Sequence, residues 1–227
     1  QAWPLLKGKV EVDEVTLSQV AVNSANLIEG MQIKGVLGRF FLQSHGVDLS
    51  NETAVVNRTE LSDTHIQLLM TDTTTTPKDT TASAPVNWKV NLHQLKLKNV
   101  SFGMKLPADS MKMAAYIGEA TIDDAKADLK NQFYGLKQFL LSGASASYDT
   151  GEAQPSEGFD ASHMAVRNIR IGLDSLLYEG RNMNAVIREI TMEERSGLSI
   201  TSLTGRLFSN DSIIRIPELK LQTPHSE

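Results

Sequence analysis

Hydrophobic and polar residues alternate along most of this chain. In Lys89-Val90-Asn91-Leu92 and in Asn168-Ile169-Arg170-Ile171, every second residue is apolar. An alternation with a period of two predicts β-strands that have one apolar and one polar face. Helix signals are weak, and we expect at most one short helix, near residues 175–183. The pattern therefore predicts an all-β fold with little helix.

The same pattern repeats along the chain. When Lys9 is aligned with Lys89, the stretch 9–68 matches the stretch 89–148 without a gap. A third copy starts at Met164, where the opening pattern recurs with Met164 in the place of Val90. We predict three β repeats at residues 1–70, 88–149 and 161–227, separated by a loop rich in Thr, Ser and Pro at 71–87 and a second loop at 150–160.

Each copy carries one step in which an extra residue interrupts the alternation. The step is Val12-Asp13-Glu14-Val15 in the first copy, Leu92-His93-Gln94-Leu95 in the second and Val166-Arg167-Asn168-Ile169 in the third. An extra residue in a strand forms a β-bulge and bends the sheet. We therefore expect an elongated, repeat-built antiparallel sheet that curls into a trough or half-open tube with an apolar inner face. A second sheet that closes over the apolar face, as in a sandwich, remains the alternative.

The candidate functional residues are the apolar residues that share one strand face. They are expected to line an apolar groove, and the alternative for each is an ordinary closed core. The predicted lining consists of Val10, Val12, Leu17, Val90, Leu92, Leu97, Val166, Ile169, Ile171, Leu219 and Leu221.

Composition excludes several classes of function. The net charge is -5, and the 22 Lys and Arg residues are scattered, which argues against nucleic acid because phosphate binding needs clustered cations. The chain has no cysteine, so it has no disulfide framework, thiolate metal site or cysteine nucleophile. No apolar run approaches the roughly 18–20 residues that span a bilayer. The sequence starts and stops within the β-strand pattern, so we expect the chain to be a piece of a longer protein.

No catalytic constellation is evident, and we expect no catalytic residue, metal site or cofactor. The pairs Asp123-Asp124 and Glu193-Glu194 are adjacent on strands, where neighbouring side chains point to opposite faces and cannot flank one bond. The five histidines are far apart and lack metal-ligand spacing. Trp3 and Trp88 each precede a repeat copy, which leaves open a carbohydrate-binding alternative.

Short β phrases such as Val12-Asp13-Glu14-Val15-Thr16-Leu17-Ser18, Leu95-Lys96-Leu97-Lys98-Asn99-Val100 and Ser202-Leu203-Thr204-Gly205-Arg206-Leu207 carry a family resemblance. They resemble the TamB (translocation and assembly module) and wider AsmA-like family of diderm bacteria, in the form found in the Bacteroides group. The resemblance covers all three copies and rests on the spacing of apolar and polar residues in these short segments.

The resemblance implies a long periplasmic protein with an anchor in the inner membrane and a C-terminal part that engages an outer-membrane assembly barrel. This chain would be an interior piece of its β-rich body, with neither the anchor nor the barrel-binding end. Such bodies are expected to carry phospholipid acyl chains between the membranes and to serve outer-membrane protein assembly. A closed β scaffold, or an adhesin-like or carbohydrate-binding repeat domain, is the alternative function.

Overall fold

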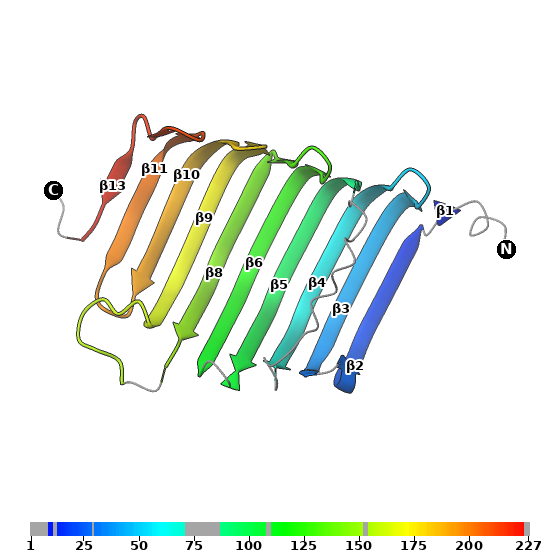
Figure 1. Ribbon diagram of the computed structural model, residues 1–227, viewed down its shortest axis with the longest axis horizontal. Helices are drawn as coiled ribbons and strands as arrows, with labels where there is room; N and C mark the ends of the chain where they lie inside the picture. The colour runs from blue at the N-terminus through cyan, green and yellow to red at the C-terminus, as the bar shows by residue number, and fades with distance from the viewer. Residues whose placement is uncertain are drawn as a thin grey trace.

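A computed structural model describes residues 9–10, 13–28, 30–70, 87–107, 110–151 and 154–224. These residues form a single sheet of thirteen strands, laid side by side along the long axis (Figure 1). The strands are β1 (Lys9–Val10), β2 (Glu14–Ile28), β3 (Met31–Asp48), β4 (Thr53–Met70), β5 (Lys89–Leu106), β6 (Met111–Asp128), β7 (Phe133–Leu136), β8 (Gln138–Asp149), β9 (His163–Glu179), β10 (Asn182–Glu194), β11 (Ser199–Ser209), β12 (Ile214–Arg215) and β13 (Lys220–Gln222). The predicted all-β, elongated sheet is confirmed.

The helix expected near residues 175–183 is wrong. This segment forms the end of β9 and the start of β10, which join in a tight turn at Gly180. The end of β9 pairs with β7 on one side and with β10 on the other. Pairing on both sides satisfies the backbone groups of this segment, and this tertiary context outweighs its weak local preference.

Neighbouring strands are antiparallel with one exception. β4 and β5 run parallel, in a register that pairs Thr53 with Lys89 and Leu69 with Lys105. A parallel neighbour requires the chain to return to the end where the previous strand began, which a tight turn cannot do. The segment 71–88 separates these two strands in the sequence and is long enough for such a return. The sheet is therefore mixed, whereas the sequence pattern suggested an antiparallel one.

The first two copies of the repeat match closely in structure. β3 begins at Met31 and ends at Asp48, and β6 begins and ends at the aligned positions of the second copy, Met111 and Asp128. The turns that follow are also alike. The side chain of Asp48 accepts a hydrogen bond from the backbone N–H of Asn51 at 3.0 Å, and Asp128 accepts the same bond from Asn131 at 3.1 Å.

The third copy differs from the first two in direction. β5 and β8 run the same way because each is antiparallel to β6, and β9 is antiparallel to β8. The first strand of the third copy therefore runs opposite to the first strand of the second. The sequences of these two strands align, but the strands themselves do not superpose.

A line of unusual backbone conformations crosses the middle of the sheet. Gln19, Asp63, Asn99, Gly143 and Asn168 have positive φ angles of 53°, 50°, 52°, 61° and 53°. They lie inside β2, β4, β5, β8 and β9, at the places where the regular pairing is interrupted. A residue in this conformation inside a strand forms a bulge that bends the strand. We call this line of five residues the bend line.

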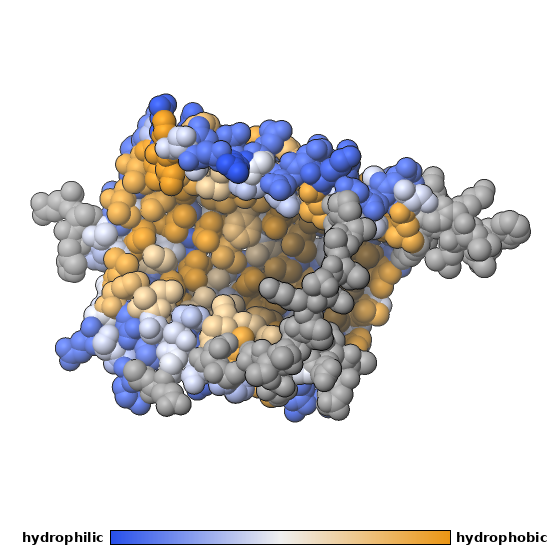
Figure 2. Space-filling view, in the orientation of Figure 1, coloured by the Kyte–Doolittle hydropathy of each residue, from blue (hydrophilic) through white to orange (hydrophobic). Residues whose placement is uncertain are grey.

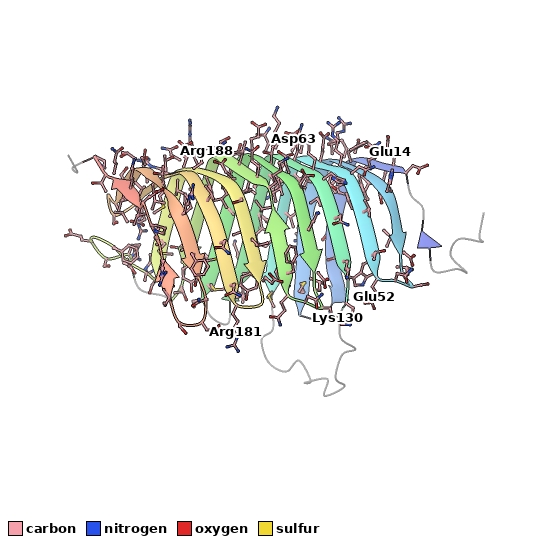
Figure 3. All side chains as sticks on the ribbon, turned by 90° about the horizontal axis from the view of Figure 1, so that it is seen from above. Glu14, Glu52, Asp63, Lys130, Arg181 and Arg188 are labelled. Carbon is pink, nitrogen blue, oxygen red and sulfur yellow. The ribbon has the colours of Figure 1, made fainter. Side chains whose placement is uncertain are left out.

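The bend gives the sheet its arched form. Seen from above, the strands arch away from the turns that contain Glu52, Lys130 and Arg181 toward Asp63 and Arg188 on the far side (Figure 3). Each bulge also shifts the alternation by one residue, so that odd-numbered Leu97 and even-numbered Phe102 of β5 face the same way.

Few hydrophobic side chains are fully enclosed. Among the described residues, those that are buried are Ala120, Ala144 and Ala185. The accessible surface of the chain is 15395 Å², whereas a compact protein of 24.9 kDa exposes about 10,000 Å². The described strands belong to one sheet, and they include no second sheet that closes over the first.

Candidate functional site

A row of hydrophobic side chains crosses ten strands at one level of the sheet. Direct cross-strand pairing connects each member to the next, so all ten side chains lie on one face. The row consists of Leu17, Phe40, Leu61, Leu97, Ala120, Leu141, Ile171, Ile190, Leu203 and Leu221. We call it the central row.

Further rows run beside the central row on the same face. One, on the side of the turns at Glu52 and Lys130, consists of Val15, Leu42, Thr59, Leu95, Ile122, Phe139, Leu173 and Ile187. Another, beyond the bend line, consists of Ile66, Phe102, Ala115, Ala146 and Val166. The three rows together define the apolar face. Figure 2 shows this face hollowed and hydrophobic in the middle, with hydrophilic residues along its two long edges.

The opposite face, which we call the polar face, carries charged and hydroxyl side chains. Next to Leu97 in β5, Lys96 lies between Glu60 of β4 and Thr121 of β6. Ion pairs also join neighbouring strands on the protein surface, as between Arg188 and Asp174 at 3.2 Å. All of these groups are accessible to water. Apolar residues also occur on the polar face, since Phe41 and Leu140 lie in the same row as Glu60 and Thr121. The two faces therefore differ in their overall polarity.

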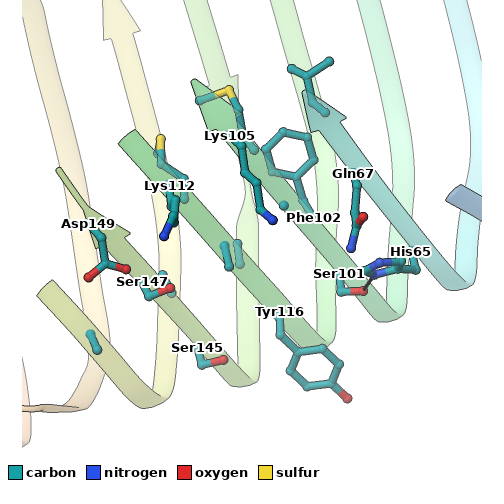
Figure 4. A pocket seen from close by; sticks show the side chains of 18 of the residues that line it. His65, Gln67, Ser101, Phe102, Lys105, Lys112, Tyr116, Ser145, Ser147 and Asp149 are labelled. Carbon is teal, nitrogen blue, oxygen red and sulfur yellow. Dashed lines mark hydrogen bonds between the residues drawn. The ribbon is translucent and has the colours of Figure 1, made fainter. Parts of the chain in front are cut away.

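A cavity of about 890 Å³ lies beyond the bend line, where the row Gln67, Gly103, Ala114 and Ser147, on the face opposite Phe102 and Met104, forms part of its wall. Six strands, from β3 to β9, contribute residues to its wall. Apolar side chains that border it include Leu68, Phe102, Met104 and Met113. In the close-up, Phe102 and Lys105 lie on one strand, Lys112 lies on the next, and a hydrogen bond of 2.6 Å joins His65 to Ser101 (Figure 4).

The structure brings together most of the predicted lining residues. Leu17, Leu97, Ile171 and Leu221 belong to the central row. The remaining described residues lie in other rows: Val90 and Leu92 toward the turns at Glu52 and Lys130, Ile169 between the bend-line residue Asn168 and the central row, Val166 beyond the bend line, and Leu219 beside Gly205. The backbone of Val10 pairs with Val47, but its side chain is outside the described part, as is the whole of Val12.

Of the predicted residues, Val166 borders the large cavity. The sequence prediction missed Phe102, Met104, Met113 and Leu68, which also border it. The bulge at Asn99 explains the omission, because counting every second residue from Leu97 places Phe102 on the wrong face. A signal was present in the repeat, since Phe102 aligns with the equally apolar Val22 of the first copy.

The acidic pairs are engaged in local contacts. The His93 side chain hydrogen-bonds the Asp124 carboxylate at 3.1 Å and thereby holds the pKa of Asp124 below its usual value. Glu193 pairs with Arg167 at 3.0 Å, and Glu194 accepts the backbone N–H of Ser196 at 2.6 Å. Within the described ranges, no group of three or more His, Cys, Asp or Glu side chains could hold a metal ion.

Of the two tryptophans, the structure describes Trp88. Trp88 is half-buried at the start of β5, and its carbonyl accepts a hydrogen bond from the N–H of Leu129 at 2.9 Å. Trp3 lies outside the described residues. The described ranges also contain no helix that is long and apolar enough to cross a membrane.

No protein-family model matches the chain. No curated protein sequence matches it either. The function of the chain therefore has to be inferred from the geometry of the apolar face and from the resemblance in sequence pattern.

Proposed function

We propose that this chain is a non-enzymatic segment of a periplasmic envelope protein that holds phospholipid acyl chains along its apolar face. In the longer protein, this segment would form part of a half-open conduit between the inner and outer membranes. The central row carries the proposal, since ten hydrophobic side chains follow one another across ten strands without a polar interruption. A conduit needs such continuity, because each polar interruption would raise a barrier to an acyl chain.

The dimensions of the row suit an acyl chain. Ten strands at about 4.8 Å spacing give a row of about 43 Å. One leaflet of a bilayer is about 15 Å thick in its hydrocarbon part, so an acyl chain would cover three or four strands. Each buried methylene contributes about 0.8 kcal/mol whichever hydrophobic residue it contacts. An acyl chain could therefore move along the face without losing most of its transfer free energy.

The solvent exposure of the apolar face distinguishes a lipid conduit from a closed scaffold. Leu17 and Leu221, at the two ends of the central row, are 42% and 50% exposed, and the members between them are half-buried except for the buried Ala120. A scaffold would instead enclose such side chains in a core, because contiguous exposed apolar surface favours association. The role in outer-membrane protein assembly and the contact with an outer-membrane barrel come from the family resemblance alone, and both would involve regions beyond this chain.

Site-specific crosslinking tests the proposal. A photoreactive phenylalanine analogue would replace Leu97 or Leu61 in the central row, and Lys96 or Glu60 on the polar face would serve as matched controls. Because Leu97 and Lys96 are adjacent in β5 and face opposite ways, the two sites differ in face and not in position. After irradiation in a diderm bacterium, mass spectrometry would measure phospholipid attached to the protein.

We expect phospholipid adducts at Leu97 and Leu61 and none above background at Lys96 and Glu60. Native mass spectrometry of the gently purified chain should also detect bound phospholipid. Adducts that form equally on both faces would contradict the proposal. A lipid-free mass together with no binding of a fluorescent fatty-acid analogue would favour a closed scaffold.

A further inference from the structure

The charge around the cavity is opposite in sign to that of the whole chain. Among the described residues that border the cavity, five are basic, namely Lys34, Lys105, Lys112, Arg167 and Arg195, and one is acidic, namely Asp149. The chain as a whole has a net charge of -5. A local excess of positive charge beside an apolar hollow attracts anions to it. The cavity is therefore suited to a ligand with an apolar body and a negative group.

The arginines are already engaged within the protein. Arg167 pairs with Glu193 at 3.0 Å, and Arg195 donates a hydrogen bond to the carbonyl oxygen of His163. The three lysines differ, since none forms an ion pair with a carboxylate in the described part of the chain. Lys105 and Lys112 are therefore free to bind an anion.

Lys105 and Lys112 lie directly opposite each other in the register of β5 and β6. Each is one residue away from the end of its strand, at Leu106 and Met111, so the pair lies at the rim of the hollow. Like charges directly opposite each other on neighbouring strands destabilise the pairing. An anion between the two ammonium groups would remove this repulsion. Asp149 faces Lys112 from β8, yet these two described side chains form no ion pair with each other.

The face of β5 and β6 opposite Lys105 and Lys112 is apolar. Met104 and Met113, which pair with each other, are adjacent in sequence to Lys105 and Lys112 and lie on the apolar face. Both methionines border the cavity. Hydrophobic surface and paired ammonium groups thus meet at one edge of the sheet. A phospholipid has the same arrangement, with acyl chains joined to a phosphodiester.

We propose that Lys105 and Lys112 bind the phosphodiester of an anionic phospholipid at the rim of the sheet, and that its acyl chains pass over this rim to lie on Met104 and Met113 of the opposite face. This inference rests on the proposed function and adds a preference for the headgroup. Lys96 and Lys98 of the same strand offer a contrast in position, because they lie on the other side of the bend-line residue Asn99, away from the rim.

The test measures binding of phosphatidylglycerol and phosphatidylcholine from mixed micelles by native mass spectrometry. It uses the whole chain, the double variant Lys105→Gln/Lys112→Gln and the matched control Lys96→Gln/Lys98→Gln. Each variant loses two positive charges, and circular dichroism would verify that both are folded. Diacylglycerol, which has acyl chains but no phosphate, reports acyl-chain binding alone.

We expect the wild type and the control variant to prefer phosphatidylglycerol by roughly three- to tenfold, and the rim variant to lose this preference while still binding diacylglycerol. The preference should also weaken as salt is added. Equal binding of the two phospholipids by the wild type, or a preference that survives in the rim variant, would overturn the inference and leave the proposed function intact. Inorganic phosphate should weaken the preference no more than sodium chloride of equal ionic strength does. A much stronger effect of phosphate would show that the site recognises free phosphate and would also overturn the inference. Failure of all three lipids to bind would instead contradict the proposed function itself.

Discussion

At the scale of single residues, the bend line depends on side chains that tolerate a left-handed backbone. Asn99 and Asp63 lie opposite each other there, and the Asn99 amide donates a hydrogen bond to the Asp63 carboxylate at 3.0 Å. The Tyr116 hydroxyl donates to the Asn99 side-chain oxygen at 3.2 Å. Asn and Asp adopt positive φ more readily than other non-glycine residues. The second copy meets the same requirement with a glycine, since Asp63 aligns with Gly143, which also has a positive φ.

The strands between those of the bend line, β3 and β6, have glycines at this level, Gly38 and Gly118. Substitution of Gly38 tests how closely β3 and β4 approach each other there. A Cβ atom on Gly38 would lie 2.3 Å from the backbone oxygen of Asp63, so Gly38→Ala must displace a strand. We expect this variant to lose about 1–3 kcal/mol of unfolding free energy in urea denaturation.

Gly103→Ala is the matched control for that measurement. Its Cβ would lie 3.8 Å from the Gln67 side chain, which is an ordinary contact, so we expect a change within about 0.5 kcal/mol. Equal stability of the Gly38 and Gly103 variants would show that the strands do not approach closely at the bend.

The sequence predicted one bend-line residue and missed the others. The extra residue in Val166-Arg167-Asn168-Ile169 pointed to a bulge, and Asn168 indeed has a positive φ of 53°. Leu97-Lys98-Asn99-Val100 contains the same interruption, since the apolar positions are odd-numbered before Asn99 and even-numbered after it, and the prediction overlooked this second step.

At the scale of elements, the alternation predicted strands well but could not predict their directions. Periodicity identifies which residues share a face, and it is the same for a strand that runs either way. The parallel pairing of β4 with β5 and the reversed third copy were therefore not predictable. The loop before β9 was predicted as a linker, yet its described residues are fixed by one side chain. Asp160 accepts hydrogen bonds from the backbone N–H groups of Ser156 and Ser162 at 3.0 and 2.9 Å.

The acid sensitivity of this loop should follow the charge of Asp160. The N–H groups of Ser156 and Ser162, together with the His163 ring, hold the pKa of Asp160 well below its usual value. A lowered pKa in the folded state stabilises the protein above the unfolded value of about 3.9, and the stabilisation is lost as the pH falls through the folded value. Asp160→Asn should therefore lower the urea midpoint at neutral pH, and the difference from wild type should shrink near about pH 2.

Asp211→Asn is the control for the pH measurement. Asp211 forms an exposed ion pair with Arg181 at 3.0 Å, so its substitution should change the midpoint little at either pH. A deficit in Asp160→Asn that is the same at both pH values would show that the carboxylate charge is not what holds the loop.

At the scale of the whole molecule, the absence of an enclosing layer over the described sheet predicts an extended particle. A compact protein of 227 residues has a radius of gyration of about 17 Å. The accessible surface of 15395 Å² is about one and a half times that of a compact protein of this mass. Small-angle X-ray scattering of the monomer should therefore give a radius of gyration clearly above about 17 Å. A value close to that of a compact protein would indicate that the apolar face closes in solution.

The parallel pairing of β4 and β5 has a consequence for how such a groove changes in length. Each of the first two copies contributes three main strands, which is an odd number, so an antiparallel junction would reverse the direction of the next copy. The parallel junction keeps both copies in the same direction, and Leu17 and Leu97, which align in the repeat, consequently occupy the same row. Duplication or deletion of one such unit at this junction would lengthen or shorten the groove by three strand spacings, about 14 Å, without turning any apolar side chain to the other face. Evolution would thus change the length of the apolar face in steps of one unit.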